Sequence, residues 1–141
     1  MRSLLTISSL MLLAGTVAGQ SPTPAGTWKG SWNSPDGSVY AATVQLSVAA
    51  DGSVDGSIDW KMTTAQRADL ISKISLHGTE FVRGTFDAHC RVLTMAGYKL
   101  DDPHAILGMD QYELILAPNG AGLGGVTANN GAWTGMLSLR R

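Results

Sequence analysis

The sequence predicts an all-β protein: an eight-stranded antiparallel up-and-down barrel with one or two short helical segments. From residue 26 onward, apolar residues alternate with small or polar ones, which is the period of a half-buried strand. Pairs such as Asp51-Gly52 and Asn119-Gly120 separate the alternating runs and suit tight hairpins, because both residue types tolerate positive φ. Strands that close on themselves leave no exposed edge, so a barrel is favoured, and a two-sheet sandwich is the alternative.

The predicted strands follow one another along the chain, and each shows this period of two. In the second strand Val44, Leu46 and Val48 lie on one face of that strand. In the last strand Leu137 and Leu139 likewise lie on a single face. Short turns join consecutive strands, which makes neighbours antiparallel. We expect strands over residues 26–33, 38–49, 53–62, 78–87, 90–100, 110–117, 121–128 and 131–139.

Two segments interrupt the alternation and predict the helical pieces. Thr63–Lys73 begins with residues that can cap a helix and then places apolar residues at helical spacing, so we expect a short helix across one barrel mouth. Asp101–Gly108 combines an aspartate that can cap, a proline that suits the first helical position and a glycine that can end a helix. This second segment predicts one helical turn.

A short motif recurs within the predicted strands: a large apolar residue precedes a glycine by two positions. Glycine weakens a strand, so its recurrence predicts bends in the barrel or close packing of the glycine against a bulky neighbouring ring. The glycines of this motif are Gly30, Gly56, Gly84, Gly97 and Gly135.

The beginning of the chain has the features of a cleaved signal peptide. Arg2 supplies a positive charge, Leu4–Ala18 is apolar but short for a membrane span, and Val17-Ala18-Gly19 ends the stretch with small residues. The mature protein is therefore expected to be secreted or periplasmic, with no membrane span. We divide the chain into a signal peptide (residues 1–19), a flexible N-terminal arm (20–25) and a single barrel domain (26–141).

Composition excludes several classes of protein. With 44% hydrophobic and 15% charged residues, the chain is not disordered. One cysteine excludes a disulfide framework, and we expect Cys90 to be buried rather than engaged in an intermolecular bridge. A formal net charge of -1 without a basic run predicts that nucleic acid is not a partner.

No group of residues predicts catalysis. His89 and Cys90 are adjacent, and adjacent strand residues point to opposite faces, so the two cannot pair as base and nucleophile. Glu80 and Glu113 are the only glutamates; a carboxylate pair at the right separation could hydrolyse glycosides, and Arg83 could equally pair with either as a surface ion. We predict no catalytic residue and no cofactor.

The densest cluster of potential metal ligands lies late in the chain. It contains Asp101, Asp102, His104 and Asp110, and its spacing matches no calcium loop. The expected helical turn already accounts for Asp102. We therefore predict no metal site.

The aromatic residues carry the leading functional hypothesis. The chain has four tryptophans, each on a predicted strand, and rings that line a barrel can contact a small apolar or aromatic ligand. Simple core filling explains them equally well, because an eight-stranded barrel is just wide enough for side chains to fill it. The ligand-binding candidates are Trp28, Trp32, Trp60 and Trp133, with Tyr40, Tyr98 and Tyr112 as secondary candidates.

The favoured function is thus a secreted, non-catalytic binding protein for a small apolar or aromatic ligand. The alternative is a protein-interaction module, such as an inhibitor of a secreted enzyme, which would expose apolar side chains on a loop or on the arm at Ser21–Pro24. An enzyme of unknown reaction is the third hypothesis.

Two short motifs carry a resemblance to known barrels. Gly26-Thr27-Trp28 and the later run Ala50–Ile58 look like the first two hairpins of the avidin/streptavidin family, and Gly26-x-Trp28 is similar to the first-strand signature of lipocalins. Both are calycins, eight-stranded ligand-holding barrels in which this tryptophan packs near an arginine from the last strand. The resemblance covers about a quarter of the mature chain and implies that role for Arg140 or Arg141.

The resemblance does not extend to biotin. In avidins an asparagine that contacts the ligand follows the tryptophan by two positions, and here that position is Gly30. Small bacterial protease inhibitors of the calycin type open with a similar Gly-x-Trp strand, which implies the inhibitor alternative.

Overall fold

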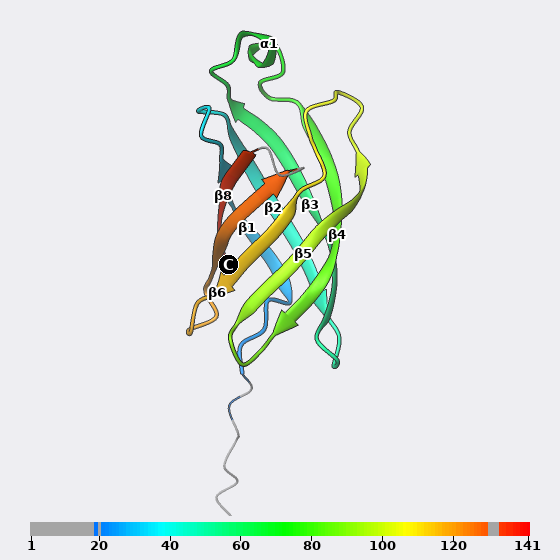
Figure 1. Cartoon of the computed structure of the whole chain (residues 1–141), viewed down its shortest axis with the longest axis vertical. Coiled ribbons are helices and arrows are strands. Elements are labelled where there is room, and N and C mark those ends of the chain that lie inside the picture. The colour runs from blue at the N-terminus through cyan, green and yellow to red at the C-terminus, as the bar shows by residue number, and fades with distance from the viewer. Residues whose placement is uncertain (1–18, 20, 130–132) are drawn as a thin grey trace, which may run out of the picture.

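The computed structural model describes residues 19, 21–129 and 133–141, with residues 133 and 134 described by their backbone alone. Within them, eight antiparallel strands form a closed barrel in which each strand pairs with the next and β1 pairs with β8 (Figure 1). The predicted up-and-down barrel is confirmed, and the sandwich is excluded because β1 and β8 are hydrogen-bonded neighbours. The expected signal peptide lies outside the described residues, except for Gly19.

The strand bounds lie close to those expected from the alternation. Most boundaries agree within one or two residues, and residues 131 and 132 of the last expected strand lie outside the described ranges. The elements are β1 (Gly26–Asn33), β2 (Val39–Val48), β3 (Ser53–Thr64), α1 (Ala68–Ile71), β4 (His77–Asp87), β5 (Val92–Asp101), β6 (Gln111–Leu116), β7 (Gly122–Asn129) and β8 (Trp133–Arg140).

The two ends of the barrel differ. The connections 34–38, 65–76 and 102–110 meet at one end, which we call the α1 end because the second of them contains α1 (Figure 1). The turns 49–52, 88–91 and 117–121 form the opposite end. We call this the terminal end, because residues 21–25 enter there and Arg141 contacts them.

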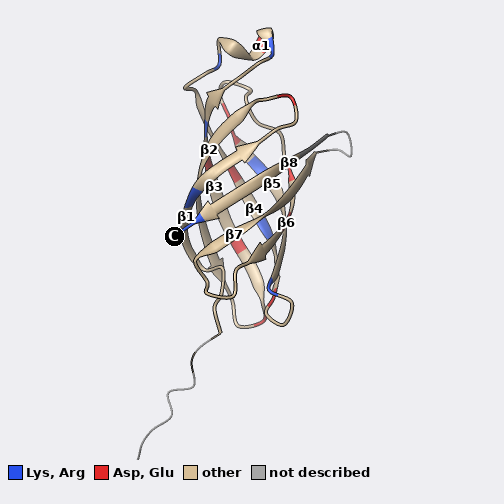
Figure 2. Ribbon diagram, turned by 90° about the vertical axis from the view of Figure 1, so that its left-hand side faces the viewer, with Lys and Arg blue, Asp and Glu red and all other residues tan. Residues whose placement is uncertain are grey.

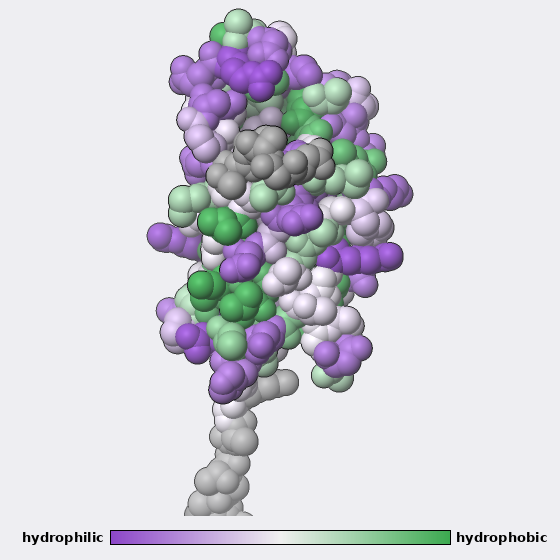
Figure 3. All heavy atoms as spheres, in the orientation of Figure 1, coloured by the Kyte–Doolittle hydropathy of each residue, from purple (hydrophilic) through white to green (hydrophobic). Residues whose placement is uncertain are grey.

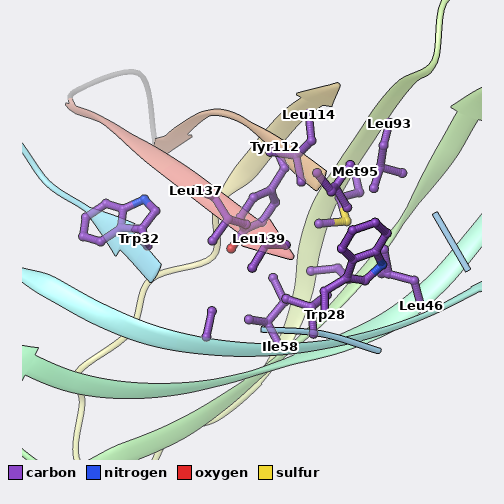
Figure 4. Close-up of a cluster of buried hydrophobic side chains, with 14 of the residues drawn as sticks. Trp28, Trp32, Leu46, Ile58, Leu93, Met95, Tyr112, Leu114, Leu137 and Leu139 are labelled. Carbon is purple, nitrogen blue, oxygen red and sulfur yellow. The ribbon is translucent and has the colours of Figure 1, made fainter. Parts of the chain in front are cut away.

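The inward side chains toward the terminal end pack into a solid core. Trp28 is fully buried there, among aliphatic side chains from several strands (Figure 4). Trp32, four residues along the same strand, lies apart from this group (Figure 4). The buried aliphatic residues drawn around Trp28 include Leu46, Ile58, Leu93, Leu114 and Leu139.

A tryptophan–arginine contact closes the terminal end. The guanidinium of Arg141 lies 4.1 Å from the ring centroid of Trp28, and the Trp28 Nε1–H donates to the Pro24 carbonyl at 2.8 Å. Arg141 also donates to the carbonyls of Thr23 (2.6 Å), Ala25 (2.9 Å) and Gly120 (2.8 Å). The expected tryptophan–arginine contact is confirmed, with Arg141 rather than Arg140, and it attaches residues 23–25 to the barrel.

The recurrent glycines occur where another atom comes close, but the predicted packing against a bulky ring is found at Gly135 alone among the five. A Cβ at Gly30, Gly56 or Gly84 would overlap a carbonyl oxygen of the neighbouring strand. At Gly97 it would overlap Glu80 Oε1, and at Gly135 it would overlap the indole of Trp32. The last two glycines therefore make room for buried side chains.

The helical expectations are only partly confirmed. α1 is a single four-residue turn at the α1 end, and the expected helix starts late because Thr63 and Thr64 extend β3. The helical turn expected over Asp101–Gly108 is wrong. Ala105 has a φ of +50°, which a right-handed helix excludes, and Asp102 Oδ2 accepts a hydrogen bond from the distant Leu107 N–H at 2.7 Å.

Cys90 is exposed, which corrects the expectation of burial. It lies in the β4–β5 turn rather than in a strand, because Asp87 Oδ1 accepts the N–H groups of both His89 (2.8 Å) and Cys90 (3.0 Å). Arg91 then takes a φ of +57° to complete the turn.

The outer surface carries charges of both signs, interspersed along the barrel (Figure 2). Two exposed ion pairs occur in the described part of the chain, Arg67–Asp69 (2.7 Å) and Arg83–Asp55 (2.9 Å). On the face shown in Figure 3 the α1 end is largely hydrophilic, and hydrophobic patches lie lower on the wall. Among the described residues, no helix is long and apolar enough to cross a membrane.

Replacing Arg141 tests the closure of the terminal end. Arg141→Ala removes the contact with Trp28 and three hydrogen bonds, so we expect the free energy of unfolding to fall by about 1–2 kcal/mol. Urea denaturation measures this change. Arg140→Ala, which alters the exposed arginine beside it, should change the same quantity by less than about 0.5 kcal/mol. Equal effects of the two substitutions would contradict the assignment.

Candidate functional site

A cavity of about 450 Å³ occupies the α1 end of the barrel. Its wall combines inward side chains near the ends of β1, β2, β3 and β4 with residues of the loops 34–38 and 102–110. Pro35, Asp36 and Arg67 lie at its rim and are exposed, so the cavity opens to solvent at this end. A volume of this size suits a small molecule.

Three aromatic side chains form one wall of the cavity. Trp32 and Tyr40 face each other across β1 and β2, with ring centroids 5.5 Å apart and planes at 75°. Tyr40 and Trp60 are 6.2 Å apart at 84°. These edge-to-face contacts hold the rings at fixed angles to one another. We call Trp32, Tyr40 and Trp60 the aromatic wall.

The polar atoms of the aromatic wall are bonded to the protein. The Trp32 Nε1–H donates to Thr127 Oγ1 at 2.8 Å, and the Tyr40 hydroxyl donates to the Ile106 carbonyl at 2.9 Å. Burial raises the pKa of Tyr40 to about 12, so this hydroxyl keeps its proton at neutral pH. The rings therefore offer carbon surface, rather than free donors, to whatever occupies the cavity.

A buried carboxylate, Glu80, lies beneath the aromatic wall. Glu80 is 1% exposed, and its Oε1 accepts the Asp110 N–H at 2.9 Å. Its Oε2 accepts the Tyr112 hydroxyl and the Trp60 Nε1–H (3.3 Å). Burial raises the pKa of Glu80, and these three hydrogen bonds oppose the rise.

Asp110 is the second carboxyl group at this depth. It is 8% exposed and lines the cavity, and its Oδ1 has no hydrogen-bond partner in the described structure. Burial, followed by the charge of Glu80, raises the pKa of Asp110 to about 7, while a hydrogen bond with Asn129 lowers it. The hydroxyl of Ser38, 3% exposed and also in the cavity wall, likewise has no partner there.

The structure brings together only part of the predicted site. Trp32, Tyr40 and Trp60 line the cavity, and Tyr112 lies beneath it as a donor to Glu80. Trp28 belongs to the packed core at the other end. Tyr98 is on the outer face, with the Arg83 guanidinium 4.1 Å from its ring centroid. Trp133 begins β8, and its side chain lies outside the described structure.

The acidic part of the site was not predicted from the sequence. Glu80 was expected to pair with Glu113 or with a surface cation, but Glu80 points into the barrel and Glu113 is exposed on the outside. The alternation of β4, in which Val82 and Phe86 point inward, places Glu80 on the same face and could have revealed it.

The other candidate chemistry does not meet at the cavity. His89 and Cys90 are exposed in a turn at the terminal end, and Asp101 and His104 are exposed near the α1 end. Within the described ranges, no three His, Cys, Asp or Glu side chains are placed to hold a metal ion.

The fold and the cavity define a class, an eight-stranded barrel with a ligand-sized cavity at one end. No protein-family model matches the chain, and no curated protein matches its sequence. Among solved structures the chain is similar to a redesigned β-barrel, mFAP0, whose structure contains bound DFHBI. The two share 13% identity over 83% of this chain and 97% of that chain, with a TM-score of 0.60, which shows the fold.

The Asp110 carboxyl predicts a dependence of stability on pH. Its pKa of about 7 in the folded protein exceeds the ordinary 3.8, so the folded state holds the proton more tightly. Its favourable contribution is complete below about pH 4 and is lost as the pH rises through 7. Between pH 5 and pH 8, the free energy of unfolding should fall less in Asp110→Asn than in the wild-type protein. The two falls should differ by on the order of 1–2 kcal/mol. Urea denaturation at both pH values measures this; parallel curves for the two proteins would contradict it.

The glycine beside Glu80 predicts a packing effect. Gly97→Ala places a methyl group on Glu80 Oε1, so we expect the free energy of unfolding to fall by about 2 kcal/mol. Gly122→Ala is the matched control, because its Cβ would meet only the Ala117 Cβ at 3.6 Å, an ordinary contact. Thermal denaturation compares the two, and a neutral Gly97→Ala would show that Glu80 is not held in this position.

Proposed function

We propose that this protein is a secreted or periplasmic, non-catalytic binding protein that holds a small ligand with an aromatic or apolar body in the cavity at the α1 end. The observation that carries the proposal is the cavity of about 450 Å³ bordered by the aromatic wall. Ile106, Leu107 and Leu70 add apolar surface to the same cavity. Export is supported by the sequence features of residues 1–19.

The barrel is rigid where the ligand would bind. The aromatic wall stands on β1, β2 and β3, which are continuously paired, and its polar atoms are fixed to Thr127, Ile106 and Glu80. A site whose rings are already held in place loses little side-chain entropy on binding, which favours affinity. The similar barrel mFAP0 was solved with a bound ligand, which agrees with this use of the fold.

The alternative, a protein-interaction module, has less support. It requires exposed apolar side chains on a loop or on the arm, whereas Pro24 is buried and its carbonyl accepts the Trp28 Nε1–H. Of the large exposed apolar residues, Ile115, Val126 and Met136 lie on the outer faces of β6, β7 and β8. Ile71, Ile74 and Met109 lie in the connections at the α1 end, so these loops do expose some apolar side chains, while the described residues of the arm expose no large one.

A fluorescent probe tests the proposal. N-phenyl-1-naphthylamine, a neutral aromatic compound that brightens in apolar surroundings, should bind the cavity with saturable fluorescence. Trp32→Leu should weaken binding roughly fivefold to tenfold, because one ring of the aromatic wall is lost. Tyr98→Leu removes an exposed ring from the outer face and should leave the affinity within about twofold. The absence of saturable binding by the wild-type protein, both of this probe and of an aromatic cation of similar size, would refute the proposal.

A further inference from the structure

We propose that the ligand is an organic cation: a small molecule with an amine or quaternary ammonium group held between the aromatic wall and the Asp110 carboxylate. This inference rests on the proposed function, since it names the chemical class of the ligand for the same cavity. It goes further because it assigns the recognition of charge to Asp110.

The carboxyl groups of Glu80 and Asp110 make one part of the cavity lining acidic, and we call this part the floor. Glu80 and Asp110 are both buried there, and the Asp110 N–H bonds directly to Glu80 Oε1, so two carboxyl groups are neighbours. The described lining contains one cationic side chain, Arg67, which is exposed at the rim and pairs with Asp69 at 2.7 Å. Residues 130–134 contain no ionisable side chain in the sequence. The floor therefore repels an anion and attracts a cation.

One acceptor on the floor is left unused by the described part of the chain. Both oxygens of Glu80 already accept hydrogen bonds, from Asp110, Tyr112 and Trp60. Asp110 Oδ1, in contrast, is buried in the cavity wall without a partner among the described residues. A buried acceptor without a partner is unfavourable, and a ligand that brings a positive charge or an N–H group to this oxygen removes the penalty.

The aromatic wall of the same cavity also favours a cation. The faces of tryptophan and tyrosine rings attract cations, most strongly when water is excluded, and clusters of such rings recognise ammonium groups. The aromatic wall supplies three rings in edge-to-face contact, and their polar atoms are already engaged. The apolar Ile106 and Leu107 would cover the body of the same ligand. Rings and carboxylate together fit a cation with an apolar body better than a neutral apolar molecule.

Proton uptake by Asp110 gives the site a characteristic pH response. Burial and Glu80 raise the pKa of Asp110 to about 7, so the carboxylate form becomes dominant only above neutral pH. The other ionisable groups around it are Glu80 on β4, Tyr112 on β6, Tyr40 on β2, Asp36 and Arg67 at the rim, and Asp102 at the start of the 102–110 loop. Burial raises the pKa of both tyrosines, which therefore stay neutral. A bound cation favours the charged form of Asp110, so binding should release protons near pH 7.

The experiment compares a cation with its uncharged counterpart. Phenethyltrimethylammonium carries a permanent charge, and (3,3-dimethylbutyl)benzene has the same shape with carbon in place of nitrogen. Each competes with N-phenyl-1-naphthylamine for the purified protein at pH 8.5. We expect the cation to displace the probe at a concentration at least about tenfold lower than the neutral compound does. Equal displacement by the two compounds would overturn the inference while leaving the proposed function intact.

Two aspartate variants test whether the preference for the cation comes from Asp110. Asp110→Asn should weaken binding of phenethyltrimethylammonium at least about tenfold and leave binding of the neutral probe within about twofold. Asp101→Asn makes the same charge change at an exposed position outside the cavity lining, and should alter neither affinity. If Asp101→Asn weakens the cation as much as Asp110→Asn does, the attraction comes from the net charge of the protein and the inference fails.

Isothermal titration calorimetry of the wild-type protein provides a test that needs no variant. Wild-type affinity for the cation should rise roughly tenfold between pH 5.5 and 8.5 as Asp110 loses its proton, and titrations at pH 7 in two buffers of different ionisation enthalpy should reveal proton release. A pH-independent affinity without proton release would overturn the assignment to Asp110. If the neutral probe does not bind at all, direct titration with the cation still decides: heat of binding supports the inference, and its absence rejects the inference together with the proposed function.

Discussion

The hydrogen bonds to the buried Glu80 carboxylate organise the interior of this barrel. They join β3 through Trp60 and β6 through Tyr112 to the β4 strand that carries Glu80, and they fix the end of the 102–110 loop through the Asp110 N–H. A carboxylate without such donors would be expensive to bury, so its three donors are a condition for its presence. Toward the terminal end the interior is filled by Trp28 and aliphatic side chains, and toward the α1 end it is hollow.

The size of the residue across the sheet decides which side chains can occupy the interior. Trp32 fits because its neighbour Gly135 has no side chain, and Glu80 fits because Gly97 has none. The same logic applies to the backbone, since Gly30, Gly56 and Gly84 let strands approach where a Cβ would overlap a carbonyl. The interior of a narrow barrel is filled where a large side chain lies beside a small residue, and Gly97 and Gly135 are the small residues of two such pairs.

Much of the fold could be predicted from the sequence, because a strand's period of two is local and the closure of eight strands follows from the need to cover edges. Much of the site could not. Trp28 and Trp32 are the same residue type, four positions apart and both inward, yet one fills the core and the other borders the cavity. Their difference comes from residues distant in sequence, Arg141 for the first and Gly135 for the second. The failed helical turn at Asp101–Gly108 has a local cause instead, because the Asp102 side chain accepts the Leu107 N–H of the same loop rather than capping a helix.

An even number of antiparallel strands brings both ends of the described chain to the same side of the barrel, where Arg141 binds the carbonyls of Thr23 and Ala25. The cavity opens at the opposite side, at the α1 end, which lies at the top of Figure 1. Anything joined to the protein at residue 21, whether a fusion partner, a linker or a solid support, would therefore leave the entrance facing outward and unobstructed. An attachment after Arg141 would share this orientation, but it would have to leave room for the guanidinium stacked on Trp28. The terminal end of the barrel is therefore the suitable side for attachment, and the α1 end, where the cavity opens, stays accessible to solvent.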